Sequence, residues 1–174
     1  RDAQLLTGIV SDMKTINGQR GRLAIFKLDD KSGVIEATVD EATMNTYRHL
    51  LREDELVIVM GKVQNDRFSG GLRLSINQVW DLNQARCRFG KYLRVAVNGT
   101  VPDIARIVRE HPARVEATEQ GNLVRGLSVR LQVLREGANA EIELGDNAKF
   151  FPSDAALASW MAQAHQGQVQ IIYE

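Results

Sequence analysis

Two groups of basic residues contain the side chains in this sequence that are best suited to a chemical role. That role is contact with phosphate. The first group runs from Lys14 to Lys27, a stretch without a carboxylate. The second flanks a loop at residues 64–71. Lys and Arg neutralise nucleic-acid phosphates, and an aromatic ring stacks a base for about 1–3 kcal/mol. The predicted nucleic-acid contacts are Lys14, Arg20, Arg22, Lys27, Lys62, Arg67, Phe68 and Arg73.

A plainer reading of the same residues is a charged, solvated surface. The chain has 22 basic and 22 acidic residues, so its net charge of zero indicates no polyanionic partner, and the electrostatic argument is local. Asp66 dilutes the second group, and Phe26 has an alternative place in the core. Contact with nucleic acid therefore stays one of two open readings at this point.

The sequence offers no recognisable catalytic or metal-binding pattern. His49, His111 and His165 are far apart and lack metal-ligand spacing. Cys87 is the single cysteine, which excludes an internal disulfide and suits a reducing cytosol. No Walker loop or GxGxxG motif is present. We therefore expect no catalytic residue, no metal and no cofactor in this chain.

The first half of the chain has the element order that would position both basic groups. Alternating apolar residues predict strands at 5–16, 23–28, 34–39, 55–63 and 72–80. The stretch 40–54 instead has helical spacing, with Asp40 as its N-cap. Three strands, a helix and two strands is the order of the OB-fold, a five-stranded barrel whose loops flank its ligand face. We predict an all-β OB-fold over residues 1–85.

The second half predicts a different architecture. Strands at 92–97, 127–134, 140–144 and 169–173 alternate with two helices, for which Thr100 and Ser153 are the expected caps. This βαββαβ order predicts a small α+β domain over residues 86–174. The polar stretch 114–125 has no clear assignment. No apolar run approaches the roughly 20 residues of a membrane span, so we expect no membrane partner.

The sequence resembles the C-terminal region of the alpha subunit of bacterial DNA polymerase III. "TGIVSDMKTINGQRGRLAIFKLDDKSGVIEATV" is similar to that family's OB domain, and "LRVAV" and "FFPSDAAL" to its last domain. The matching positions in the first stretch are Gly8, Val10, Lys14, Gly21, Arg22, Phe26, Asp30, Gly33, Glu36 and Val39. The resemblance covers nearly the whole chain, although Asp40 stands where the family usually has an aromatic residue.

The resemblance implies functions that the spacing does not. It implies that the OB domain contacts single-stranded DNA and that the last domain docks to the tau subunit of the clamp loader. Some members also bind the sliding clamp through a terminal hexapeptide, where Gln168, Ile171 and Tyr173 lie here, with Ile and Tyr in place of the usual Leu and Phe. The chain is then a non-catalytic, cytoplasmic piece of a bacterial DNA-directed DNA polymerase, whose catalytic carboxylates lie upstream.

Two alternatives belong to other functional classes. In the first, the chain is a pure protein-interaction or spacer module that binds no nucleic acid. In the second, the barrel is the anticodon-binding OB domain of a tRNA synthetase, which the α+β tail and the lack of a second base-stacking aromatic in the loops disfavour.

Overall fold

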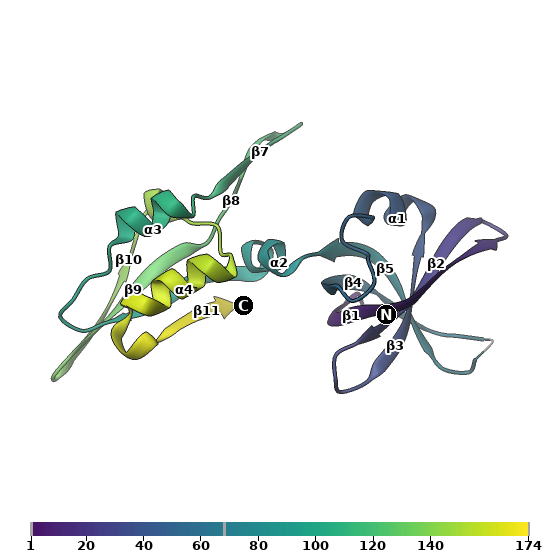
Figure 1. Ribbon diagram of the computed structural model, residues 1–174, viewed down its shortest axis with the longest axis horizontal. Coiled ribbons are helices and arrows are strands. Elements are labelled where there is room, and N and C mark those ends of the chain that lie inside the picture. The colour runs from purple at the N-terminus through teal and green to yellow at the C-terminus, as the bar shows by residue number, and fades with distance from the viewer. Residues whose placement is uncertain (1, 68, 174) are drawn as a thin grey trace. The chain divides into compact units, whose positions relative to one another are not determined.

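The protein folds as two compact units, which are joined between Leu82 and Asn83. The computed structural model (Figure 1) describes residues 2–67 and 69–173. Each unit has its own hydrophobic core. Within the described residues, no helix combines the length and apolar character needed to cross a membrane.

The first unit is a closed five-stranded barrel with strand order β1-β2-β3-β5-β4. Its strands are β1 (Gln4–Gly18), β2 (Gly21–Asp29), β3 (Val34–Asp40), β4 (Leu56–Asn65) and β5 (Leu72–Trp80). The long β1 closes the barrel because it pairs with β2 through its second half and with β4 through its first. The β1–β2 hairpin extends beyond the body of the barrel (Figure 1).

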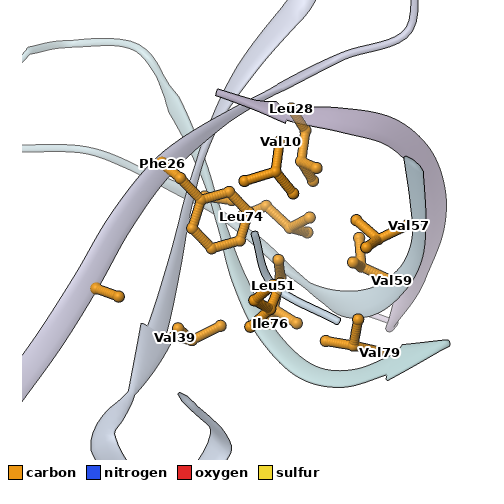
Figure 2. Packing of buried hydrophobic residues seen from close by; sticks show 12 residues of the cluster. Val10, Phe26, Leu28, Val39, Leu51, Val57, Val59, Leu74, Ile76 and Val79 are labelled. Atoms are coloured by element: carbon orange, nitrogen blue, oxygen red, sulfur yellow. The ribbon is translucent and has the colours of Figure 1, made fainter. Parts of the chain in front are cut away.

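Alternation along the strands fills this barrel with apolar side chains. Figure 2 shows Phe26 of β2 beside Val10 and Leu74, with the remaining core residues around them. Phe26 is 0% exposed, so the alternative that placed it in the core is correct and its ring is not available to a base. In β2 and β3 the residues that alternate with these core residues face outward. This alternation determines which of the predicted nucleic-acid contacts lie on the outer surface of the sheet.

Helix α1 (Glu41–Tyr47) follows β3 and is shorter than the predicted stretch 40–54. It begins as expected, because the Asp40 carboxylate accepts a hydrogen bond of 2.8 Å from the Thr43 amide. Leu51, which continued the helical spacing, reaches the core from the turn beyond the helix and is 2% exposed. The helical spacing of apolar residues therefore predicted the burial of Leu51 correctly, but it predicted a helix that is too long.

The second unit is an α+β domain built on a four-stranded sheet with order β10-β9-β6-β11. Its elements are α2 (Leu82–Phe89), whose first residue precedes the division between the units, β6 (Gly90–Val97), α3 (Ile104–Glu110), β9 (Ser128–Arg135), β10 (Ala138–Glu143), a 3-10 turn (Asp146–Ala148), α4 (Asp154–Gln163), a second 3-10 turn (His165–Gly167) and β11 (Val169–Tyr173). Helices α3 and α4 pack on one face of the sheet, where Trp160, Phe150 and Leu93 are all 0% exposed.

The helix caps of this unit were predicted with mixed success. Ser153 caps α4 as expected, through a bond of 3.1 Å from the Ala156 amide to its hydroxyl oxygen. The prediction of Thr100 as the cap of α3 was wrong: the cap is Asp103, which accepts from the Arg106 amide at 3.2 Å. The helix starts after Asp103, so Pro102 lies before it and not in its first turn.

The stretch 114–125, unassigned from sequence, forms a separate two-stranded sheet. Strands β7 (Arg114–Thr118) and β8 (Gly121–Arg125) pair only with each other among the described strands, and Figure 1 shows the hairpin projecting from its unit. Arg125 pairs with Glu116 at 2.8 Å across the hairpin. The Arg114 guanidinium lies 3.7 Å from the centre of the Phe151 ring and ties the hairpin base to the domain.

Candidate nucleic-acid interface

A continuous row of outward-facing residues crosses all five strands of the barrel. Ala24, Phe26, Ala37 and Leu74 face the core, so their neighbours face solvent. Successive register partners in the row are Lys14, Ile25, Thr38, Ser75 and Lys62. At roughly 4.8 Å per strand, the row covers about 19 Å along the sheet. The row thus has an uncharged centre of one apolar side chain and two hydroxyls between two lysines, and we call these five residues the outer row.

The adjacent row has the opposite character because its charges neutralise one another. Register pairs Lys27 with Glu36, Glu36 with Arg73 and Arg73 with Gln64. Arg73 forms an ion pair with Glu36. The Lys27 ammonium lies 2.7 Å from the carboxylate of Asp12, a residue at a β-bulge of β1 with a φ of 54°. The predicted contacts Lys27 and Arg73 are therefore already paired with carboxylates, and we call this the paired row.

The Lys27–Asp12 pair also shifts the titration of both groups. The hydrogen bond from Lys27 and its charge lower the pKa of Asp12 below its ordinary value of 3.8. The same hydrogen bond and the carboxylate charge raise the pKa of Lys27 above 10.5. Both side chains are exposed, at 52% for Lys27 and 60% for Asp12, so solvent screens much of this attraction. A phosphate approaching Lys27 would compete with an existing partner.

Asp66 organises the β4–β5 loop and ties it to β5. Its side chain is 5% exposed and lies 3.1 Å from the Arg73 guanidinium. It also accepts a hydrogen bond from the Ser69 amide at 3.0 Å, and the backbone N–H of Asp66 donates to the Gly71 carbonyl at 2.8 Å. Asp66 therefore does dilute the second basic group, because its carboxylate pairs with Arg73 of that group.

The β4–β5 loop also carries two predicted contacts. Arg67 is exposed on it, whereas Phe68, the predicted base-stacking ring, lies outside the described residues. No other aromatic residue belongs to the described positions of the outer or paired rows. These rows therefore offer charge and hydrogen bonding to a ligand.

Arg20 and Arg22 occupy the far end of the β1–β2 hairpin, and Arg22 lies on its other face. Arg22 has the same parity as the buried Ala24, and so opposite parity to Ile25 of the outer row. It lines a hollow of about 280 Å³ between the hairpin and α1, together with Arg48. The predicted contacts consequently do not form one surface.

Five of the predicted cations have no carboxylate within 4.0 Å in the part of the chain that the structure describes. They are Lys14, Arg20, Arg22, Lys62 and Arg67, and all five are exposed. Sequence reasoning missed Arg48 because its nearness to Arg22 arises only when α1 packs against β2. It also missed Asp12 and Glu36 as partners, since strand register alone brings them to Lys27 and Arg73.

Two of the predicted docking residues near the C-terminus, Ile171 and Tyr173, lie in the paired strand β11, and Gln168 directly precedes it. Ile171 of β11 pairs with Leu93 of β6 and packs against the core of the second unit. Tyr173 is 50% exposed, and the backbone carbonyl of Gln168 accepts a hydrogen bond from the Ala96 amide. The segment is therefore part of the sheet, and insertion of Ile171 into a partner's pocket would require its side chain to leave the core.

The barrel topology can now be compared with known families. Residues 5–82 match the family model described as an OB-fold nucleic acid binding domain. The closed five-stranded barrel with a helix between β3 and β4 has that architecture. The first unit is an OB-fold. The predicted OB-fold followed by an α+β unit is confirmed in its architecture.

Curated relatives extend the similarity beyond the OB-fold. Over 96% of its length the chain is 29% identical to DNA polymerase III subunit alpha of Escherichia coli O157:H7. Over 55% of its length it is 35% identical to the same subunit of Pseudomonas fluorescens. The chain spans 14% and 8% of the lengths of these two proteins. The resemblance to the C-terminal region of this subunit is confirmed.

Solved structures also resemble the OB-fold unit. The mitochondrial single-stranded DNA binding protein Rim1 of S. cerevisiae aligns with 47% of this chain and 95% of its own, at 16% identity and a TM-score of 0.39.

Among the described residues, no group of three or more His, Cys, Asp or Glu side chains is placed to hold a metal ion.

Proposed function

We propose that the OB-fold unit binds single-stranded DNA through its backbone phosphates, along the outer row and the two hairpins beside it. The observation that carries this proposal is the contrast between the two rows. Lys14 and Lys62 lie at the two ends of the outer row without carboxylate partners, whereas Lys27 and Arg73 of the paired row form ion pairs. Arg20 and Arg67 extend the positive charge onto the hairpin ends. The match of residues 5–82 to a nucleic acid binding family supports the same ligand class.

Binding of this kind depends on charge and is weakly selective for base sequence. Ile25, Thr38 and Ser75 between the lysines present a small apolar group and two hydroxyls, which do not form a stacking platform. Phosphate contacts fix position and carry no sequence information. The OB-fold unit then guides template DNA, and the chain itself performs no catalysis; the longer parent protein is a DNA-directed DNA polymerase.

The second unit is proposed to dock the tau subunit of the clamp loader, with the sliding clamp as a second candidate partner. The similarity of nearly the whole chain to DNA polymerase III subunit alpha supports this assignment. A clamp contact through Gln168, Ile171 and Tyr173 carries an added cost, because Ile171 must leave its core. Docking of the folded surface is therefore the favoured mode, in a cytoplasmic bacterial replication complex.

Fluorescence anisotropy with labelled oligo-dT at several salt concentrations tests the DNA proposal. The slope of log K against log salt should fall by about 0.7 for each phosphate neutralised on a single strand. Replacing each of Lys14, Lys62 and Arg67 singly by Glu should weaken the binding strongly, whereas Arg52→Glu, the same charge change outside the outer row, should leave most of it. No binding by the unmodified chain at low salt would refute the proposal.

A pure protein-interaction or spacer module is the second candidate function, and the paired row favours it. A sheet face whose cations are satisfied by Asp12, Glu36 and Asp66 needs no polyanion. This candidate predicts capture of tau by the full chain with no measurable affinity for oligo-dT. Parallel pull-downs with purified tau and with purified clamp separate the two partners, and capture of neither refutes the docking assignment.

A further inference from the structure

A hollow lies between the β1–β2 hairpin and α1, on the opposite face of the hairpin from the outer row. Its volume is about 280 Å³. The hairpin contributes Thr15, Arg22, Leu23 and Ala24, and the segment of α1 contributes Glu41, Met44, Asn45 and Arg48. Helix α1 packs on β2, so the two walls belong to the same compact unit (Figure 1).

Two arginines converge on this hollow from separate walls. In the part of the chain that the structure describes, neither Arg22 nor Arg48 has a carboxylate within 4.0 Å, although Glu41 also lines the hollow. The Arg48 guanidinium is oriented by donation to the Asn45 side-chain oxygen at 2.9 Å. Two like charges placed at one hollow repel each other, and an anion between them would remove that repulsion.

The walls between the charged groups suit an oxyanion. Leu23, Ala24 and Met44 form the apolar part of the lining, against which the stem of an arginine side chain can pack. The Thr15 hydroxyl and the Asn45 amide supply polar groups at the same place. Arginine's planar fork of N–H groups matches phosphate geometry better than an ammonium does. The volume lies just below the roughly 300–1,000 Å³ of ordinary small-molecule sites, which fits one phosphate with part of its sugar.

We propose that this hollow is a second phosphate-binding site, in which Arg22 and Arg48 hold one phosphate group from two sides. The inference rests on the proposed DNA-binding function where the phosphate belongs to a bound strand; a free phosphate is the other source of the same chemistry. A strand bound on the outer row would reach the hollow by passing around the end of the hairpin at Arg20. This role explains why Arg22 lies off the outer row.

Anisotropy with labelled oligo-dT and the whole 174-residue chain tests the site. Arg48→Gln should weaken binding about three- to tenfold and reduce the salt slope by about 0.7, the value of one phosphate contact on a single strand. Arg52→Gln removes the same charge four positions along, does not line the hollow, and should leave affinity and slope unchanged. Glu41→Gln removes the one acid in the hollow and should tighten binding, an effect that a merely structural role would not produce.

Titration with inorganic phosphate, followed by NMR of the arginine side-chain N–H groups, tests the site without DNA. Saturable shifts of Arg22 and Arg48, lost in Arg48→Gln, support a phosphate site even if the chain binds no oligonucleotide. Equal oligo-dT affinities of Arg48→Gln and Arg52→Gln, together with no saturable phosphate shift, overturn it. If Lys62→Gln still weakens oligo-dT binding in that case, the proposed DNA function stands and this site alone is refuted.

Discussion

The guanidinium of Arg73 lies 3.1 Å from the nearly buried carboxylate of Asp66, and it also pairs with Glu36 of β3. This one arginine therefore connects the β4–β5 loop to the face of the barrel. A residue predicted as a DNA contact is thus a structural tie.

Asp66→Ala should loosen the β4–β5 loop. The change removes the acceptor of the Ser69 amide and one of the two partners of Arg73, and the loss of a typical hydrogen bond costs about 0.5–1.5 kcal/mol. Native-state hydrogen exchange should show faster exchange of β4 and β5 amides. Glu119→Ala, an exposed acid in the turn between β7 and β8, is the control. Unchanged exchange in Asp66→Ala would show that the ion pair does not hold the loop.

Lys14→Gln and Lys27→Gln should differ in their effect on oligo-dT binding. Lys14 has no carboxylate partner among the described residues, whereas Lys27 is held by Asp12 at 2.7 Å. Removing Lys14 should weaken binding severalfold and make the salt slope less negative by about 0.7, the contribution of one phosphate contact. Lys27→Gln should have a smaller effect, since a phosphate gains little from a lysine that is already neutralised. Equal losses in anisotropy would mean that the Asp12 pair opens when DNA binds.

Gly61→Ala should destabilise the barrel, whereas Gly33→Ala should not. A methyl group at Gly61 would overlap the backbone carbonyl of Ser75 on the paired strand β5, beside the bulge between Met60 and Gly61. Forcing extra volume into a packed site costs about 1–3 kcal/mol. At Gly33 no atom lies within 4 Å of the added methyl. Hydrogen exchange of barrel amides should separate the two variants, and equal stabilities would contradict the close approach at Gly61.

Asp103→Ala should destabilise the second unit by about 0.5–2 kcal/mol, the usual cost of losing an N-cap. Thr100→Ala should have little effect, because the α3 cap is the Asp103 carboxylate, which accepts from the Arg106 amide. Exchange rates of the α3 amides measure the difference. A larger effect at Thr100 would favour the cap position that the sequence alone suggested.

The Asp40 cap should make α1 sensitive to acid. The hydrogen bonds from Thr43, through its backbone and its side chain, lower the pKa of Asp40 below 3.8. A carboxylate whose pKa is lowered by folding stabilises the fold at pH values above its pKa in the unfolded state. This stabilisation disappears as the pH falls through its pKa in the folded state. NMR titration should therefore place the Asp40 pKa below 3.8. In Asp40→Asn, which keeps an acceptor and does not titrate, amide exchange in α1 should depend less on pH below 4.

The barrel was predictable because each strand has its own local pattern of alternating apolar and polar residues. In β3, Ile35, Ala37 and Val39 alternate with outward residues, and the structure confirms that Ala37 and Val39 face the core. The helix was located correctly but made too long, because burial of Leu51 continues its spacing from a turn. Local pattern therefore recovered the order of elements better than their ends.

The pairing of the basic residues was not predictable in the same way. Glu36 reaches Arg73 only because β3 and β5 pair in parallel, a contact between strands that are not consecutive in the chain. Asp12 reaches Lys27 through a bulge with a left-handed backbone, for which an aspartate in the sequence is a weak signal. Which cation is available to a ligand is thus a property of register.

The isolated β7–β8 hairpin is a region in which we expect substitutions to have little effect on the stability of the fold. Outside its base, where Arg114 stacks on Phe151, the hairpin side chains are mostly exposed, and the two strands share no ladder with the main sheet. Its turn at Glu119 and Gln120 is accordingly a suitable position for inserting an epitope or a fluorescent label, which would report on this unit while sparing the fold that carries it.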